Sequence, residues 1–595
     1  MPYIAPVKDM LFVMNELAGL SDVVAYPQYA EAGADVDLAP AILEEAAKFN
    51  QDVVAPLNWP GDQNPSALRD GEVYTTPGFK EAFEQFAAAG WQGVIHPAEF
   101  GGQGLPKLIA SACFEMVHSA SLSFALCPML TDGAIEALLT AASPELQERF
   151  VPKMISGEWT GTMNLTEPQA GSDLSMVRSR AVPQGDGTYR IFGTKIFITY
   201  GEHDMASNIV HLVLARTPDA PEGVKGISLF VAPKFMVNAD GSLGERNDIQ
   251  CVSLEHKLGI KASPTAVLQF GDHGGAIGYL VGEENRGLEY MFVMMNAARF
   301  SVGMQGIAVA ERAYQKAVQY AKDRVQSRDL AGSPGPVAII QQPDVKRMLM
   351  TMRAYVESSR ALAYYAAAEC DVQHASPDEA ARKVSQSLYE FLVPIVKGFS
   401  TEMSIDVASL GVQVHGGMGF IEETGAAQHY RDARILTIYE GTTAIQANDL
   451  IGRKTLRDGG AAAQLLAEKI KVTEKALAAD ASPAAQAVLK QLTPAREAFE
   501  ASVAYILANA KTDIKAVYAG SFAYLRLCGL VLGAWQMARA LLAAERLREG
   551  DPSFYDAKIA TARFFAENIL PQTQALATSI LEGGHSTNAL AVEQF

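Results

Sequence analysis

The spacing of apolar residues changes twice along this 595-residue chain, and that change limits the folds open to it. Before about residue 159, and again from about residue 283, apolar side chains recur at helical spacing. From 159 to 282 the chain carries short β-type runs separated by Gly, Asp and Pro clusters. We therefore predict a mostly α protein with a central antiparallel β domain. No run leads into a G-x-G-x-x-G turn and helix, which disfavours a Rossmann fold.

The two patterns can be assigned to individual elements. The expected helices are 40–49, 77–89, 108–126, 288–324, 343–370, 377–412 and 442–454, and the expected strands are 189–199, 209–215, 226–231 and 266–270. Long helices joined by short connections are typical of a bundle. The expected parts are an N-terminal extension (1–35), a helical domain (36–158), the β domain (159–282), the bundle (283–456) and an additional C-terminal helical domain (457–595).

Composition excludes some classes of protein. A formal net charge of −18 argues against nucleic-acid binding, because phosphate contacts need a positive surface. Five scattered cysteines predict neither a disulfide framework nor a metal site, and they fit a reducing compartment. The most apolar stretch, 527–535, is shorter than the roughly 20 residues of a membrane span, and residues 1–20 lack a signal-peptide core. We expect a cytoplasmic protein without a transmembrane segment.

Three stretches are dense in Gly, hydroxyl and carboxylate side chains: 165–173 (LTEPQAGSD), 413–420 (QVHGGMGF) and 431–443 (RDARILTIYEGTT). Small residues let a backbone approach a ligand closely, and amides with hydroxyls suit a ring edge or a phosphate. Each stretch alone has a simpler interpretation. The first suits a capped turn and the second a tightly packed loop, while Glu440 suits the positive end of a helix.

In this order and spacing the stretches resemble the acyl-CoA dehydrogenase family. Thr-Glu-Pro-x-x-Gly-Ser-Asp and Tyr-Glu-Gly-Thr are its two signatures, 195–199 (KIFIT) resembles its flavin strand, and Gln413-x-x-Gly-Gly its cofactor loop. The resemblance covers about residues 40–454 and implies the family's helical, β and four-helix order. A longer bacterial branch also has the N-terminal extension and the additional C-terminal domain. That branch includes 3-methylmercaptopropionyl-CoA dehydrogenases and fatty acyl-CoA dehydrogenases.

The resemblance implies FAD-dependent α,β-dehydrogenation of an acyl-CoA to a trans-2-enoyl-CoA, as in fatty-acid β-oxidation. Glu440 corresponds to the base that removes the α-proton, and hydride passes from the β-carbon to flavin N5. A Glu with an ordinary pKa near ~4.3 is a poor base, so we expect burial to raise its pKa. Some relatives place the base on an earlier helix, but residues 296–299 (NAAR) contain no carboxylate.

The resemblance also assigns binding residues. For FAD they are Leu165, Thr166, Ser172, Phe197, Thr199, Arg324, Gln413, Gly417 and Thr442. For the substrate they are Ser172, Asn296, Arg299, Tyr439 and Gly441. Arg324, Gln413 and Gly417 are expected to reach the FAD of a neighbouring subunit, which implies a homo-oligomer. Phe197 and Asn296 stand where many relatives have Trp and Asp.

Several functions stay open. The acyl group can be a fatty acyl chain or 3-methylmercaptopropionyl, and an acyl-CoA oxidase would use the same base and flavin. A dehydrogenase of this family would pass electrons to an electron-transfer flavoprotein. A flavin-bearing binding protein without turnover, such as the family's DNA-binding branch, is disfavoured by the negative charge and the retained Glu440.

Overall fold

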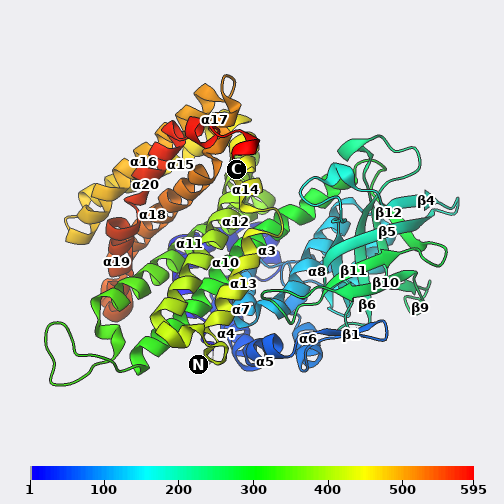
Figure 1. Cartoon of the computed structure of the whole chain (residues 1–595), viewed down its shortest axis with the longest axis horizontal. Helices are drawn as coiled ribbons and strands as arrows, with labels where there is room; N and C mark the ends of the chain where they lie inside the picture. Colours follow the sequence, from blue (N-terminus) through cyan, green and yellow to red (C-terminus); the bar gives the residue numbers. More distant parts are fainter. Residues whose placement is uncertain (1–2) are drawn as a thin grey trace.

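The computed structural model describes residues 3–595, with the elements in the predicted order of helices, strands and helices. In Figure 1 the sheet lies on one side, long helices cross the middle, and the C-terminal helices cover the opposite side. The prediction of a mostly helical protein with a central β domain and an additional C-terminal helical domain is confirmed.

The N-terminal part is helical from its first turns. Its helices are α1 Val7–Glu16, α2 Leu20–Val24, α3 Pro27–Glu31, α4 Leu38–Phe49, α5 Asn58–Gln63, α6 Phe79–Ala88, α7 Lys107–Ala120, α8 Leu122–Ala141 and α9 Pro144–Ile155, with a hairpin of β1 Ala67–Arg69 and β2 Glu72–Tyr74. The single helix predicted at 108–126 is instead two. Ser121 takes an extended conformation between α7 and α8, and its side chain caps α8 by accepting the Phe124 N–H (3.4 Å).

The β domain centres on an eight-stranded sheet. Its strands are β3 Trp159–Asn164, β4 Arg180–Pro183, β5 Thr188–Thr199, β6 Asn208–Ala215, β7 Ser228–Pro233, β10 Ile249–Leu254, β11 Thr265–Phe270 and β12 Ala276–Val281, and β8 Phe235–Val237 pairs with β9 Leu243–Arg246. The order is β10-β11-β5-β12-β7-β6-β3, with β4 beside β5. The expected antiparallel pairing holds except between β3 and β6, which are parallel. Sequence periodicity does not distinguish the two directions, because both alternate side chains between faces.

Three long helices form the centre of the bundle: α10 Gly287–Asp323, α11 Pro343–Ala375 and α12 Glu379–His415. Two short helices follow, α13 Ala426–Ala433 and α14 Thr443–Ile451. In Figure 1 the connection between α10 and α11 extends away from the body of the protein. The three long helices lie where predicted, because their apolar residues continue at helical spacing over many turns, although α11 and α12 continue past their predicted ends at 370 and 412. The helix predicted at 442–454 is shorter, and α13 was not predicted.

The C-terminal helices share their core with the bundle. They are α15 Ala461–Ala479, α16 Pro483–Asn509, α17 Ile514–Ala519, α18 Ser521–Leu547, α19 Pro552–Phe564, α20 Gln572–Glu582 and α21 Gly584–Thr587. One apolar core runs from Tyr3 to Ile580 through the N-terminal part, the bundle and α18. The contact is close at Gly529, where an added Cβ would lie 2.2 Å from the Phe399 ring. Only glycine permits this approach.

Two helices of the described chain are long and apolar enough to cross a membrane by length and composition, Leu122–Ala141 and Ser521–Gly550. The second helix contains the apolar 527–535 segment and extends beyond it at both ends. In their most apolar windows, 83% and 89% of the residues are buried inside the protein.

A buried charge cluster joins the N-terminal segment to the rest of the protein. Arg360 on α11 is 1% exposed and donates to Asp9 of α1 (2.6 Å), Glu115 of α7 (2.6 Å) and Glu311 of α10 (2.8 Å). Lys558 of α19 also binds Asp9. Burial raises the pKa of Asp9, but Lys558 and Arg360 outweigh it and hold the pKa at about 2. Asp9 therefore stays ionised at neutral pH, and the cluster connects α1 with α7, α10, α11 and α19.

Replacing Arg360 with Met tests this cluster. The change leaves the carboxylates of Asp9, Glu115 and Glu311 without their shared cation, so we expect the free energy of unfolding to fall by about 3–5 kcal/mol. Urea unfolding at pH 7 measures it. The control is Arg286→Met, which removes a solvent-exposed ion pair and should leave the midpoint unchanged. Equal midpoints for the two variants would contradict the role of Arg360.

Candidate active site

Glu440 lies in a tight loop between α13 and α14. Glu440 and Gly441 have successive positive φ angles of 53° and 82°. A non-glycine residue in this region costs roughly 1–3 kcal/mol, so its surroundings must hold it there. Gln446 Nε2 donates to the carbonyl of Glu440 (3.2 Å), and Thr442 caps α14 by accepting the Ile445 N–H (3.4 Å). Strain of this kind is characteristic of functional positions.

Lys397 of α12 anchors both ends of this loop. Its side chain is 0% exposed, and Nζ donates to the carbonyls of Leu436 (2.9 Å) and Gly441 (2.7 Å). Burial lowers the pKa of Lys397 to about 7, against the opposing influence of Glu440. Lys397 was not among the residues predicted from the sequence. A lone lysine within the apolar run 392–399 (LVPIVKGF) was the available signal.

The Glu440 carboxyl has an unusual pKa for its type. Burial raises it to about 7, while Lys397 and Arg299 act in the opposite direction. Both cations have other partners. Arg299 of α10 is 5% exposed and pairs with Asp449 of α14 (3.4 Å), so it is a buried ion pair and not the ordinary surface pair that a helical arginine commonly forms. Glu440 can therefore change protonation state near neutral pH, as expected from the sequence.

The side chain of Tyr439, beside Glu440, points inward toward α10. Its hydroxyl donates to Gln305 Oε1 of α10, and Gln305 Nε2 in turn lies 3.3 Å from the Met129 sulfur of α8. The Glu440 loop thus contacts two helices of the bundle, α12 through Lys397 and α10 through Gln305. The structure brings together four of the predicted residues here: Arg299, Tyr439, Glu440 and Gly441.

A second group forms where the 165–173 loop lies against β5. Glu167 accepts Lys195 Nζ (2.8 Å), the Ser179 hydroxyl (2.6 Å) and the N–H groups of Arg178 and Ser179. Burial raises the pKa of Glu167, but the Lys195 charge and these hydrogen bonds hold it at about 2. Its oxygens are fully used, so Glu167 anchors the loop and is not an alternative base.

This anchoring places the predicted ring-contacting residues side by side. The Ile196 N–H donates to the Thr166 carbonyl (2.9 Å), and Lys195 Nζ also donates to the Leu165 carbonyl (3.1 Å). Phe197 has a φ of 60° and is 57% exposed, an unusual combination for an aromatic residue inside a strand. Thr199 is half-buried at the end of the same strand, and Ser172 is exposed on the loop.

The remaining predicted residues lie on the surface of the bundle. Arg324, Gln413 and Gly417 are exposed at the ends of α10 and α12, which the stacked rings of Tyr320 and His415 hold together (centroids 4.3 Å apart). Asn296 is exposed on α10, three residues before Arg299. Within this one chain, these four residues make no described hydrogen bond with the Glu440 loop.

The chain matches known protein families over most of its length. The N-terminal, middle and C-terminal domain models of acyl-CoA dehydrogenases match residues 39–158, 162–273 and 285–455, and a model described as acetyl-CoA dehydrogenase C-terminal like matches 466–591. A 3-methylmercaptopropionyl-CoA dehydrogenase of Ruegeria pomeroyi is 54% identical, over 98% of this chain and 99% of that protein. A butyryl-CoA dehydrogenase of Syntrophomonas wolfei is 35% identical, over 96% and 95%.

The fold comparison agrees. A Bacillus anthracis acyl-CoA dehydrogenase solved with FAD has a TM-score of 0.73 at 20% identity, covering 95% of this chain and 90% of that one. The predicted fold is confirmed, including the additional C-terminal domain.

The Glu167–Lys195 pair yields a prediction. Glu167→Gln leaves the Lys195 ammonium, 0% exposed, without its charged partner, and we expect a loss of about 3–5 kcal/mol in the free energy of unfolding. The double change Glu167→Gln with Lys195→Met removes both charges and should recover most of that loss. Urea unfolding of the single and double variants measures both. A double variant as unstable as the single one would refute this interpretation.

Proposed function

The chain belongs to the acyl-CoA dehydrogenase family and is an enzyme of that class, and we propose that Glu440 is its catalytic base. The reaction proposed is removal of the α-proton of an acyl-CoA thioester by Glu440, with loss of hydride from the β-carbon, to give a trans-2-enoyl-CoA. The observation that carries the proposal is the Glu440 carboxyl itself, held in a strained loop with a pKa raised to about 7. A base works best when its pKa lies near the working pH.

The thioester carbonyl must be stabilised as the α-proton leaves. Donors aimed at the developing negative charge provide this stabilisation. The N–H groups of Ile438 and Tyr439 are bonded to the Ile435 carbonyl. Among the backbone hydrogen bonds of residues 3–595, none uses the Glu440 N–H. The base and this N–H belong to one residue, so a substrate positioned for one is also within reach of the other.

The 165–173 loop and strand β5 of the β domain suit a flat ring such as that of FAD. Phe197 offers an exposed aromatic face, and the adjoining Leu165–Thr166 backbone is tied to β5 by the bonds to Lys195 and Ile196. No neighbour lies within 4 Å of a Cβ added at Gly171, which leaves room for a phosphate beside Ser172. Bound there, FAD would accept the hydride. Thr199 and Thr442 are proposed to complete the site within the same subunit.

Arg324, Gln413 and Gly417 are proposed to bind the FAD of a neighbouring subunit. They are exposed in the single chain, and Met418 and Phe420 beside them are 49% and 86% exposed. Apolar side chains of this size are commonly covered when subunits associate. A homo-oligomer with shared FAD sites follows, and an electron-transfer flavoprotein is proposed as the electron acceptor.

The acyl group proposed is short. The two full-length relatives described above are named for 3-methylmercaptopropionyl-CoA and butyryl-CoA. Asn296, Ser172 and Arg299 are proposed to bind the CoA part, with Arg299 on the side nearest Glu440, since its charge acts on that carboxyl. An oxidase would share this site. Oxygen consumption with peroxide release matching substrate turnover would establish that alternative.

Glu440→Gln tests the base directly. The amide cannot take a proton, so we expect kcat with butyryl-CoA to fall by at least about 10²-fold, the lower range of general-base catalysis. Flavin content and substrate affinity should be retained, as measured by the flavin absorbance and its shift on adding butyryl-CoA. Turnover near the normal rate would refute the assignment.

Lys397→Met tests the electrostatics of the loop. The base must be deprotonated, so kcat/KM of the unaltered enzyme should fall as pH drops through about 7. The Lys397 charge lowers the pKa of Glu440. Without it, the fall in kcat/KM on the acidic side of the pH profile, called here the acidic limb, should move to higher pH. Lys397→Arg should keep it in place. The control is Lys454→Met, which alters a surface pair with Glu390. An unmoved limb in Lys397→Met would show that the lysine acts on structure alone.

A further inference from the structure

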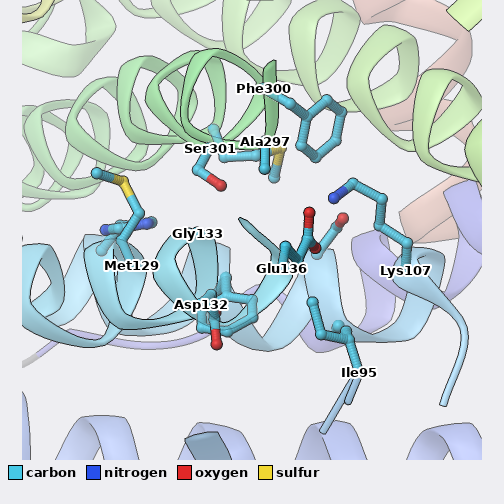
Figure 2. A pocket seen from close by; sticks show the side chains of 14 residues that line it. Ile95, Lys107, Met129, Asp132, Gly133, Glu136, Ala297, Phe300 and Ser301 are labelled. Atoms are coloured by element: carbon cyan, nitrogen blue, oxygen red, sulfur yellow. The ribbon is translucent and has the colours of Figure 1, made fainter. Parts of the chain in front are cut away.

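A small cavity lies between α7, α8 and α10. Its wall includes Lys107, His118, Met129, Asp132, Glu136 and Met304. The cavity is large enough for roughly two water molecules. Figure 2 shows Lys107 and Phe300 together at one end and Met129 at the other. The cavity therefore has a charged end and an apolar end.

His118 of α7 is the unusual member of this lining. It is 1% exposed, and neither ring nitrogen has a hydrogen-bond partner within the described chain. Burial lowers the pKa of His118 to about 3, so the ring is neutral, with one N–H donor and one acceptor. Leaving such a group unpaired costs about 1–3 kcal/mol. A buried imidazole without a partner beside a cavity indicates that a ligand group supplies the partner.

Two other polar side chains of the cavity, Asp132 and Lys107, have partners. Asp132 accepts from His96 (2.9 Å) and from Gln92. The ammonium of Lys107 lies 5.0 Å from the centre of the Phe300 ring. Among the side chains that line the cavity, only His118 has buried polar atoms without a hydrogen-bond partner in residues 3–595, so it is the group that a bound molecule would satisfy.

Gln305 connects a wall of the cavity to the Glu440 loop. Met304 and Met129 line the cavity, and Gln305, next to Met304, joins the Met129 sulfur to the Tyr439 hydroxyl. Its apolar walls include Met129, Met304, Phe114 and Phe300, and sulfur and aromatic groups make favourable contacts with one another. Gly133 contributes no side chain, and a Cβ there would lie 2.9 Å from Met294 Cγ. An acyl chain passing Tyr439 would enter here.

From these contacts we infer that the cavity receives the far end of a short acyl chain and favours a chain in which a thioether sulfur or ether oxygen replaces a methylene. His118 donates its N–H to that atom and acts as a specificity-determining residue. The inference rests on the proposed function, because it takes Glu440 as the point from which the chain extends. The small volume suits the end of a short chain, and the unpaired N–H disfavours a plain hydrocarbon.

Pentanoyl-CoA, 3-(methylthio)propanoyl-CoA and 3-methoxypropanoyl-CoA form the test set. Their acyl groups have equal numbers of non-hydrogen atoms and differ only in one CH2, S or O. The measurement is the ratio of kcat/KM for each heteroatom substrate to that for pentanoyl-CoA, in the unaltered holoenzyme and in His118→Leu. Dividing the two ratios cancels the effect of sulfur or oxygen on the intrinsic reactivity of the β-carbon. We expect His118→Leu to reduce the ratio about fivefold for at least one heteroatom, the factor that an ordinary hydrogen bond provides.

Two variants control for structural effects. His118→Gln keeps an N–H donor and should retain more of the preference than His118→Leu. Ser111→Ala alters the same wall without removing the imidazole and should leave the ratio unchanged. His118→Leu should fold at least as stably as the unaltered enzyme, because it removes an unpaired polar group. If His118→Leu does not fold, the ratios are measured in His118→Gln instead. Complete loss of the heteroatom preference in His118→Gln would overturn the proposed role of the N–H donor.

Ratios that are the same with and without His118 would overturn the inference, as would occupation of the cavity by ordered water alone in the substrate complex. Those results leave the proposed function intact if pentanoyl-CoA is still turned over in a Glu440-dependent way. Absence of turnover with all three substrates would instead contradict the proposed function.

Discussion

The buried cluster around Arg360 is the interaction on which the arrangement of the chain depends. It connects α1, α7, α10 and α11, and through Asp9 it reaches Lys558 of α19. These helices also position the site, because α10 carries Arg299 and Gln305. Buried charges are costly unless each finds its partners, so the cluster permits one assembly of these helices and penalises others.

The same principle recurs at the site on a smaller scale. Lys397 and Lys195 are both fully buried, and each bonds a loop of the candidate site to a rigid element. The strained residues Glu440 and Phe197 occur in or beside these anchored segments. A backbone in the left-handed region persists only where its surroundings hold it, and the two lysines supply that restraint. The proposed base and the proposed ring platform are therefore pre-organised by bonds made to neighbouring carbonyls and carboxylates.

Much of this could be predicted from the sequence. The helices at 288–324, 343–370 and 377–412 and the strands at 189–199, 209–215, 226–231 and 266–270 follow from local periodicity, and the family follows from the two signatures with their spacing. The strands β3, β4, β8, β9, β10 and β12 were not predicted. The split of 108–126 at Ser121 was missed, because a serine cap within a continuous apolar pattern gives a weak signal. The parallel pairing of β3 with β6 was also missed, because strand direction depends on residues distant in the sequence.

Glu440 illustrates the division between the two kinds of information. The sequence by itself determined the family, the order of domains and the identity of the candidate base, because motif residues and their periodicity are local properties. Only the tertiary structure decided that burial raises the pKa of Glu440, that Lys397 holds its loop, and that Glu167 is committed to Lys195. It alone brought His118 to the wall of a cavity that Gln305 connects to Tyr439. Burial and charge pairing arise between segments tens to hundreds of residues apart, and no local pattern records them.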